Sequence, residues 1–300
     1  KRAKYPKFKK KGTHDSFYIG GDQLKIIENK VKIPNLGWVR LRENLRYQGK
    51  IKGATVSRIA NHWMISVCVE TDQKPAQCEN QAVVGVDLGI KTLATFSNGT
   101  TISNQKPLAK RLKKLKRLQR RLSRMEKGSK NRNKQKDILA RQHYKVACKR
   151  NDHLHKITTH LTENYRYIVI EDLDISEMLK NKRLSRSIAD GGWYEFRRQL
   201  AYKASLRGNR IFIADQWYAS SKKCSGCEYV KKELSLSERI YVCDYCKLSI
   251  DRDLNAALNL KKLIDTVSST EINACGQDGS VVMLKSSQQP AWKNQELSRV

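Results

Sequence analysis

The chain has 300 residues, enough for one large domain or for two to three modules with a core of ordinary size. It carries 60 Lys and Arg against 29 Asp and Glu, a formal net charge of +31, which makes a polyanion the expected partner. The sequence contains no run of about 18 apolar residues, and its first residues lack the apolar segment of a signal peptide. These features exclude a membrane-spanning protein and predict an intracellular, cytoplasmic one.

The N-terminal part, residues 1–80, has the pattern of a small β module. Short apolar or alternating segments follow one another between residues 17 and 70, and turn residues such as Gly20, Gly21, Asn35 and Asn61 separate them. The pattern predicts a small antiparallel sheet or a partial β-barrel. Residues 71–81 are polar and predict a linker.

Strands and helices then alternate, which predicts an α/β fold. A strand, a Gly-containing turn and a second strand are expected within VVGVDLGIKTLATFSNGT, which begins at Val83. Further strands are expected at residues 167–172 and 209–215, and helices at 191–207 and 251–263. In the first of these helices Trp193, Phe196 and Leu200 share one face, and core packing explains them better than base stacking. Residues 266–300 are polar and Ser-rich, and predict a flexible tail.

Residues 106–150 are strongly basic, with 19 Lys and Arg and only two acids. Leucines at helical spacing and the break at Gly128-Ser129 predict two antiparallel helices within residues 106–164, the second from about Ile138. A charge run is often only a solvated face. Because the acids that would pair with these cations are missing, contact with nucleic acid is the preferred interpretation. The candidate contact residues are Lys113, Lys114, Arg117, Arg120, Arg121 and Arg124.

Four of the eight cysteines form two CxxC pairs, Cys224/Cys227 and Cys243/Cys246, separated by fifteen residues. This is the spacing of a zinc ribbon, in which two turns supply four thiolates to a tetrahedral Zn²⁺. Since all four positions are filled, the site is predicted to be structural. A redox CxxC or a reduced thiol pair is the alternative.

Three carboxylates occupy positions that suit a catalytic Mg²⁺ site. Asp87 ends the apolar run VVGVD, Glu171 ends YIVIE, and Asp253 lies seven positions after the last cysteine. A carboxylate at the tip of a buried strand is costly unless another charge neutralises it. Two Mg²⁺ ions held by about three converging carboxylates can hydrolyse a phosphodiester bond. Taken singly, Asp87 could be a turn or N-cap residue and Glu171 a salt-bridge partner.

Two alternatives at these positions stay open. The run VGVDLG also occurs in sugar-kinase and actin-type ATPases, but these need further Gly-rich phosphate loops, which do not follow here. Asp251 could replace Asp253 as the third carboxylate, because the two lie two positions apart and only one is expected to face the site. Asp172 follows Glu171 but should point to the opposite face of its strand.

The segments GVDLGIKTLATFSNG, VIEDL, GWYEFRRQLAYKA, SSKKCSGC and YVCDYCKLSIDRDLNAALNL resemble the TnpB proteins of insertion sequences, formerly called OrfB transposases. The compact type V CRISPR effectors are relatives of that family. The resemblance extends over residues 1–263. It implies a ribonuclease H-like (RuvC) nuclease domain over residues 81–220 and 251–265, a zinc ribbon at 221–250, and a partial wedge-like β-barrel at 1–80. The family's helical recognition segment and the start of its barrel would precede Lys1, so the chain is expected to be a fragment.

The resemblance further implies an RNA-guided, Mg²⁺-dependent DNA endonuclease at the prokaryotic nucleoid. Its partners would be a guide RNA from the transposon end and a target DNA. Asp87, Glu171 and Asp253 match the family's catalytic carboxylates, and the four cysteines named above match its zinc ligands. The alternative is a nuclease-inactive, RNA-guided DNA-binding repressor, which would have lost a carboxylate. A transposase that itself joins strands is a third hypothesis.

Overall fold

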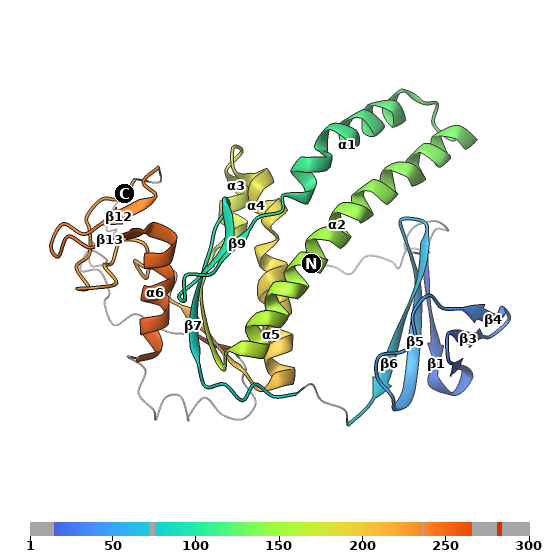
Figure 1. Cartoon of the computed structure of the whole chain (residues 1–300). Helices are drawn as coiled ribbons and strands as arrows, with labels where there is room; N and C mark the ends of the chain where they lie inside the picture. The colour runs from blue at the N-terminus through green and yellow to red at the C-terminus, as the bar shows by residue number, and fades with distance from the viewer. Residues whose placement is uncertain (1–14, 73–75, 236, 266–280, 284–300) are drawn as a thin grey trace, which may run out of the picture. The chain divides into compact units, whose positions relative to one another are not determined.

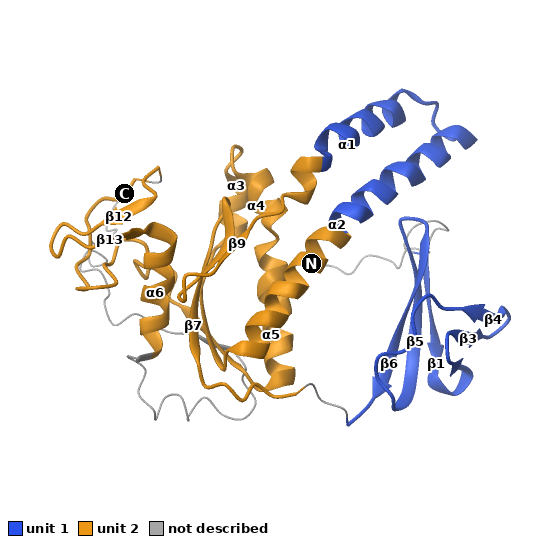
Figure 2. Ribbon diagram, in the orientation of Figure 1, with its two compact units in different colours: residues 1–74, 111–147 blue, residues 75–110, 148–300 orange. Residues whose placement is uncertain are grey.

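A computed structural model describes residues 15–72, 76–235, 237–265 and 281–283. The chain divides into two compact units (Figure 2). The first contains residues 1–74 and 111–147, and the second contains residues 75–110 and 148–300. The predicted mixed α/β class is confirmed. Within the described ranges, no helix combines the length and the apolar character needed to cross a bilayer.

The N-terminal part of the first unit consists of two three-stranded antiparallel sheets. One has the order β1-β5-β6 and the other the order β2-β3-β4. Their strands are β1 (Ser16–Gly20), β2 (Lys25–Ile27), β3 (Lys30–Ile33), β4 (Gly37–Arg40), β5 (Lys50–Ile59) and β6 (His62–Glu70), with a short 3₁₀ helix at Gly21–Gln23. These six strands occupy the region between residues 17 and 70 where short strands were predicted, with β1 beginning one residue earlier. Their apolar side chains share one small core.

The basic region forms helices α1 (Pro107–Arg124) and α2 (Lys130–Asn164) (Figure 1). The predicted start of the second helix at about Ile138 is therefore wrong by about two turns. Ser129 explains the early start, because its Oγ accepts a hydrogen bond from the backbone N–H of Arg132 at 3.2 Å and so satisfies one of the free donors of the first turn. Gly128, with φ of 91°, makes the preceding turn.

The second unit is built on a six-stranded sheet in the order β14-β11-β10-β7-β8-β9. Its strands are β7 (Val83–Leu88), β8 (Thr92–Phe96), β9 (Thr101–Ser103), β10 (Tyr167–Glu171), β11 (Arg210–Ala214) and β14 (Val281–Met283). The first three form an antiparallel meander, and β10, β11 and β14 continue parallel to β7. Strand β14 corrects the prediction of a loose tail at that point, since its apolar residues pair with the open edge of β11. The rest of the predicted tail lies outside the described residues.

Helices cover both faces of this sheet. Helices α2 and α5 (Trp193–Arg207) bury their apolar side chains against alternate residues of the central strands, so the stripe of Trp193, Phe196 and Leu200 is core, as predicted. Helix α6 (Arg252–Asp265) packs on the other face through Leu260 and Ile264. The remaining elements are α3 (Ile175–Lys180), α4 (Ser185–Gly191), β12 (Ile240–Val242) and β13 (Ser249–Asp251).

Gly85 permits the close approach of α6 to β7. A Cβ atom built at this position would lie 2.0 Å from the carbonyl oxygen of Ala257 and 2.6 Å from the backbone nitrogen of Lys261. Any side chain would therefore push the helix away from the strand. Because Asp87 lies two residues further along the same face of β7, Gly85 also sets how near the start of α6 comes to that carboxylate.

Candidate carboxylate and cysteine sites

The three predicted carboxylates lie on one face of the sheet, near the C-terminal ends of the central strands β7 and β10. Strands β7 and β10 run parallel, and their register pairs Val86 with Ile170. Asp87 and Glu171 occupy the next position of each strand, so they are neighbours on the face that α6 covers. Asp253 belongs to the first turn of α6. All three side chains are half-buried.

The electrostatics of the three groups show that they act on one another. Burial raises the pKa of Asp87 well above its usual range, and the charges of Glu171 and Asp253 raise it further. Burial likewise raises the pKa of Glu171, with a further contribution from Asp253. The hydrogen bond from Ser220 and the charge of Arg252 oppose that rise. The three negatively charged groups lie close together and are partly removed from water. This arrangement favours the binding of a cation.

Asp251, the alternative third carboxylate, has a structural role in this chain. Its Oδ1 accepts hydrogen bonds from the backbone N–H groups of Asp253 (2.9 Å) and Leu254 (3.0 Å), so it caps the N-terminus of α6. Helical periodicity does not decide between Asp251 and Asp253, because Asp251 ends β13 and precedes the helix. Its side chain is exposed. Asp253 thus remains the better candidate.

Asp172 points away from this edge, as the alternation of side chains predicts. Its Oδ1 lies 2.7 Å from Nη1 of Arg197 on α5, the helix that covers the opposite face. It offers a comparison residue next to Glu171, with the same chemistry and a different environment.

Two features of the carboxylate site escaped the sequence patterns. Ser220, which is buried, donates a hydrogen bond from its hydroxyl to Oε1 of Glu171. Arg239 lies 4.0 Å from Asp253, measured from Nη1 to Oδ1, and its position depends on the pairing of β12 with β13. The available signal for Ser220 was its place just before Cys224, in a segment that must pass from the sheet to the cysteine module.

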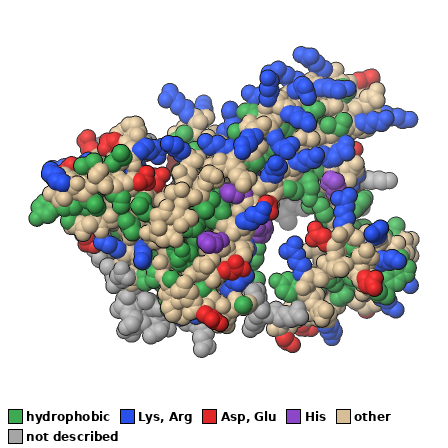
Figure 3. Space-filling view, in the orientation of Figure 1, with side chains coloured by type: hydrophobic (Ala, Val, Ile, Leu, Met, Phe, Trp, Pro, Cys, Tyr) green, Lys and Arg blue, Asp and Glu red, His purple; other side chains and the backbone are tan. Residues whose placement is uncertain are grey.

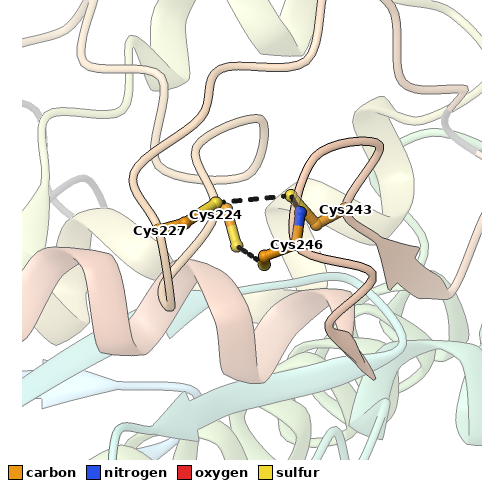
Figure 4. Close-up of side chains that lie close together, drawn as sticks. All are labelled: Cys224, Cys227, Cys243 and Cys246. Atoms are coloured by element: carbon orange, nitrogen blue, oxygen red, sulfur yellow. Dashed lines mark hydrogen bonds between the residues drawn. The ribbon is translucent and has the colours of Figure 1, made fainter.

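The four predicted cysteines converge, and their sulfur atoms all lie within 4.8 Å of one another (Figure 4). The Sγ atoms of Cys224 and Cys246 are 3.6 Å apart, as are those of Cys227 and Cys243. Among the described residues, these four cysteines form the one group of possible metal ligands whose ligand atoms all lie this close together. Tight turns present the sulfurs: the N–H of Cys224 donates to the carbonyl of Tyr229, and that of Cys243 to Leu248.

This arrangement fits a tetrahedral metal ion. With Zn–S bonds of about 2.3 Å, the edges of an S₄ tetrahedron are about 3.8 Å long, close to the observed separations. Cys224 and Cys243 are buried and contact the fully buried ring of Tyr241, so the cluster also forms the core of its module. The four cysteines can therefore hold a metal ion such as zinc, and four thiolates would fill its tetrahedral coordination.

The six predicted contact residues on α1 are all exposed. In the described parts of the chain, none of the six forms an ion pair with an acid. Four of them, with Met125, line a shallow hollow on the helix: Arg117, Arg120, Arg121 and Arg124. The opposite side of α1 buries Leu115 and Leu118. Figure 3 shows the Lys and Arg side chains gathered over α1 and the first half of α2.

Two family models and a solved structure are similar to parts of this chain. The family model OrfB_IS605, described as "Probable transposase", matches residues 66–182, and the model "Cas12f1-like, TNB domain" matches residues 193–260. A solved structure titled "Cryo-EM structure of the Cas12f1-sgRNA-target DNA complex" is similar with a TM-score of 0.47 and 20% identity, over 71% of this chain and 45% of that one.

Curated relatives extend over most of the chain. It is 38% identical to "Putative RNA-guided DNA endonuclease InsQ" of Escherichia coli (strain K12), over 92% of this chain and 71% of that protein. It is 35% identical to "Putative RNA-guided DNA endonuclease" of Streptomyces pristinaespiralis, over 87% of this chain and 65% of that protein. The chain belongs to the OrfB family of insertion-sequence proteins, also called the TnpB family. It spans about two thirds of the length of these relatives.

Proposed function

We propose that this chain is the nuclease part of an RNA-guided, Mg²⁺-dependent DNA endonuclease that belongs to a transposable element. The observation that carries the proposal is the meeting of Asp87 and Glu171 at adjacent strand ends, against the start of the helix that carries Asp253. The raised pKa values of the two strand-end carboxylates support it, because a divalent cation would relieve the cost of their charges. The names of the relatives support the substrate class.

In this proposal the domain of β7 to β11 and α6 is a ribonuclease H-like (RuvC) nuclease, and Asp87, Glu171 and Asp253 would hold Mg²⁺. Bound Mg²⁺ would supply an activated water and stabilise the leaving oxygen of a phosphodiester bond. Residues of the chain itself would position these carboxylates and adjust their charge. The strand ends hold Asp87 and Glu171 half-buried, and the charge of Arg252 lowers the pKa of both without neutralising them.

The cysteine module would hold structural Zn²⁺, and the basic helices would hold nucleic acid. The exposed, unpaired cations of α1 suit the backbone of an RNA–DNA heteroduplex, whose sequence is read by base pairing. The guide RNA would come from the transposon end.

Co-purified RNA tests the guide, and cleavage tests the reaction. RNA bound to the purified protein should map to DNA flanking the element, and a DNA target complementary to it should be cut in Mg²⁺. Wild-type protein that binds the guided target and leaves it intact in Mg²⁺ would favour the repressor alternative. RNA of random genomic origin would contradict guidance altogether.

A further inference from the structure

Residues 218–225 follow β11 and extend into the first cysteine pair, and one of them contacts Glu171; we name this segment the strap. Ser220 lies at its centre and is only 4% exposed. Its hydroxyl donates to Oε1 of Glu171. Among the described residues, no second side chain donates a hydrogen bond to this carboxylate.

The strap is fastened to α6 by a buried amide. Nδ2 of Asn259 donates to the carbonyl oxygen of Ser220 at 2.8 Å and to that of Lys223 at 2.6 Å. The hydroxyl of Tyr218 returns a hydrogen bond to the carbonyl of Asn259 at 3.2 Å. Asn259 is fully buried, and its Oδ1 finds no hydrogen-bond partner in the described part of the chain. A buried acceptor without a partner is costly, and the two hydrogen bonds that the amide donates oppose that cost.

The other end of the strap is tied to the cysteine module. Asn255, one turn before Asn259, donates to the carbonyl of Lys223 at 2.7 Å and accepts from the N–H of Ser225 at 2.9 Å. The hydroxyl of Tyr241 donates to the carbonyl of Lys222 at 3.2 Å. The strap therefore links Glu171, helix α6 and the first cysteine pair through buried or half-buried bonds.

From these contacts we propose that Ser220 is a positioning residue for Glu171 and that the strap makes its position depend on the cysteine module. The terminal torsion of a glutamate has a broad energy minimum, so the side chain does not fix its own carboxyl plane. A buried hydroxyl on Oε1 holds that plane and leaves the lone pairs of the second oxygen to bind a cation. The inference rests on the proposed nuclease function, because it concerns the same carboxylate site.

The test compares Ser220→Ala with Ser220→Thr, and uses Ser221→Ala as a matched control. Ser221 is the next residue of the strap, is half-buried and makes no side-chain hydrogen bond to another described residue. Mn²⁺ serves as the probe, and its affinity for the full zinc-loaded chain is measured by electron paramagnetic resonance. DNA affinity, zinc content, thermal unfolding and the rate of guided DNA cleavage are measured on the same samples.

Ser220→Ala should bind Mn²⁺ about tenfold more weakly and cut DNA about tenfold more slowly, the effect of losing a hydrogen bond to a charged group. Its zinc content and DNA affinity should match the wild type, and Ser220→Thr should recover any loss in the unfolding midpoint. Ser220→Thr keeps the hydroxyl and should recover most of the Mn²⁺ affinity, and Ser221→Ala should behave as the wild type.

Three outcomes separate the possibilities. Equal Mn²⁺ affinity for Ser220→Ala and the wild type overturns the positioning role. Loss of zinc or a lowered unfolding midpoint in both Ser220 variants, without rescue by Thr, also overturns it, because Ser220 would then only support the fold. A Mn²⁺ deficit rescued by Thr in a chain that never cuts DNA supports the positioning role and contradicts the proposed function.

Discussion

Two clusters of like charge in this chain differ in their surroundings. The carboxylates Asp87, Glu171 and Asp253 are half-buried near the C-terminal ends of the central strands. Burial and mutual repulsion raise the pKa of Asp87 and Glu171 there. The cations of α1 are exposed along one helix, where water screens their repulsion. Neither cluster contains enough opposite charge to neutralise itself. The comparison teaches how surroundings select a counterion: under the proposed function, the half-buried acids would hold a small cation and the exposed bases an extended polyanion.

Removal of a carboxylate should produce the largest effect. Asp87→Ala, Glu171→Ala or Asp253→Ala should reduce DNA cleavage by at least about a thousandfold, because each removes a ligand of the proposed Mg²⁺ site. Binding of guided DNA should change little. Cleavage rates and equilibrium binding, both measured in Mg²⁺, check the two halves of this expectation.

Two neighbouring aspartates act as controls for that experiment. Asp172→Ala removes a carboxylate of the opposite face and should leave cleavage within a few fold of the wild type. Asp251→Ala removes the cap of α6, at a cost to stability of about 1 kcal/mol, with only a partial loss of cleavage. Wild-type cleavage by all three alanine variants of the site would refute the catalytic assignment, and complete loss in Asp251→Ala alone would move the third carboxylate by two positions.

Loss of metal from the cysteine cluster should come next in size. Cys224→Ser or Cys243→Ser should release one zinc ion per chain, loosen residues 224–250 to proteolysis and slow cleavage at least tenfold, because thiolate binding supplies the folding energy of such modules. Zinc is measured by mass spectrometry and proteolysis by fragment mapping. Cys148→Ser, which changes an exposed cysteine, is the control. Freshly purified wild type without zinc would contradict the assignment.

The cysteine and carboxylate sites also show how much of a site can be predicted from the sequence. The CxxC spacing is local, so the thiols could be grouped from the sequence, and the structure brings all four together. The carboxylates are far apart along the chain; the ends of apolar runs marked Asp87 and Glu171, and the position seven residues after the last cysteine marked Asp253. Ser220 and Gly85 could not be found in this way, because their roles depend on the side chain or helix that the fold places opposite them. Strand β14 was missed because a strand of three residues within a polar stretch is too short to show a periodic pattern.

Neutralising the exposed cations should weaken binding without changing specificity. A variant with Gln at Lys113, Lys114, Arg117, Arg120, Arg121 and Arg124 should bind RNA–DNA hybrid more weakly, whatever its sequence. The slope of log affinity against log salt should fall by about one for each phosphate group that the variant no longer neutralises. Lys156 and Lys180, each already paired with an acid, provide the matched control when changed to Gln. Identical slopes for the sixfold variant and the wild type would mean that α1 carries only a solubilising face.

The smallest expected effect is a gain of stability when one buried charge is removed. The folded-state pKa of Asp87 lies above its unfolded value, so its ionised form destabilises the folded, Mg²⁺-free chain. That penalty is complete above the folded pKa and disappears as the pH falls below about 3.9, the usual value for an unfolded aspartate. Asp87→Asn should therefore unfold at a higher temperature than the wild type at pH 8, and the difference should narrow toward pH 5. A gain of about 2–4 °C corresponds to each kcal/mol in a domain of 150–250 residues.

Calorimetric scans measure this difference in unfolding temperature. The buffer contains no Mg²⁺, and it contains no chelator because a chelator would remove zinc. Asp172→Asn is the control, because Arg197 stabilises the charge of Asp172 and its removal should bring no gain. Added Mg²⁺ should then reverse the order, raising the unfolding temperature of the wild type and leaving that of Asp87→Asn nearly unchanged. An Asp87→Asn variant that is less stable than the wild type at pH 8 would show that the carboxylates are already neutralised within the chain. The carboxylates would then carry no unneutralised charge, and their comparison with the exposed cations of α1 as a second charged cluster would fail.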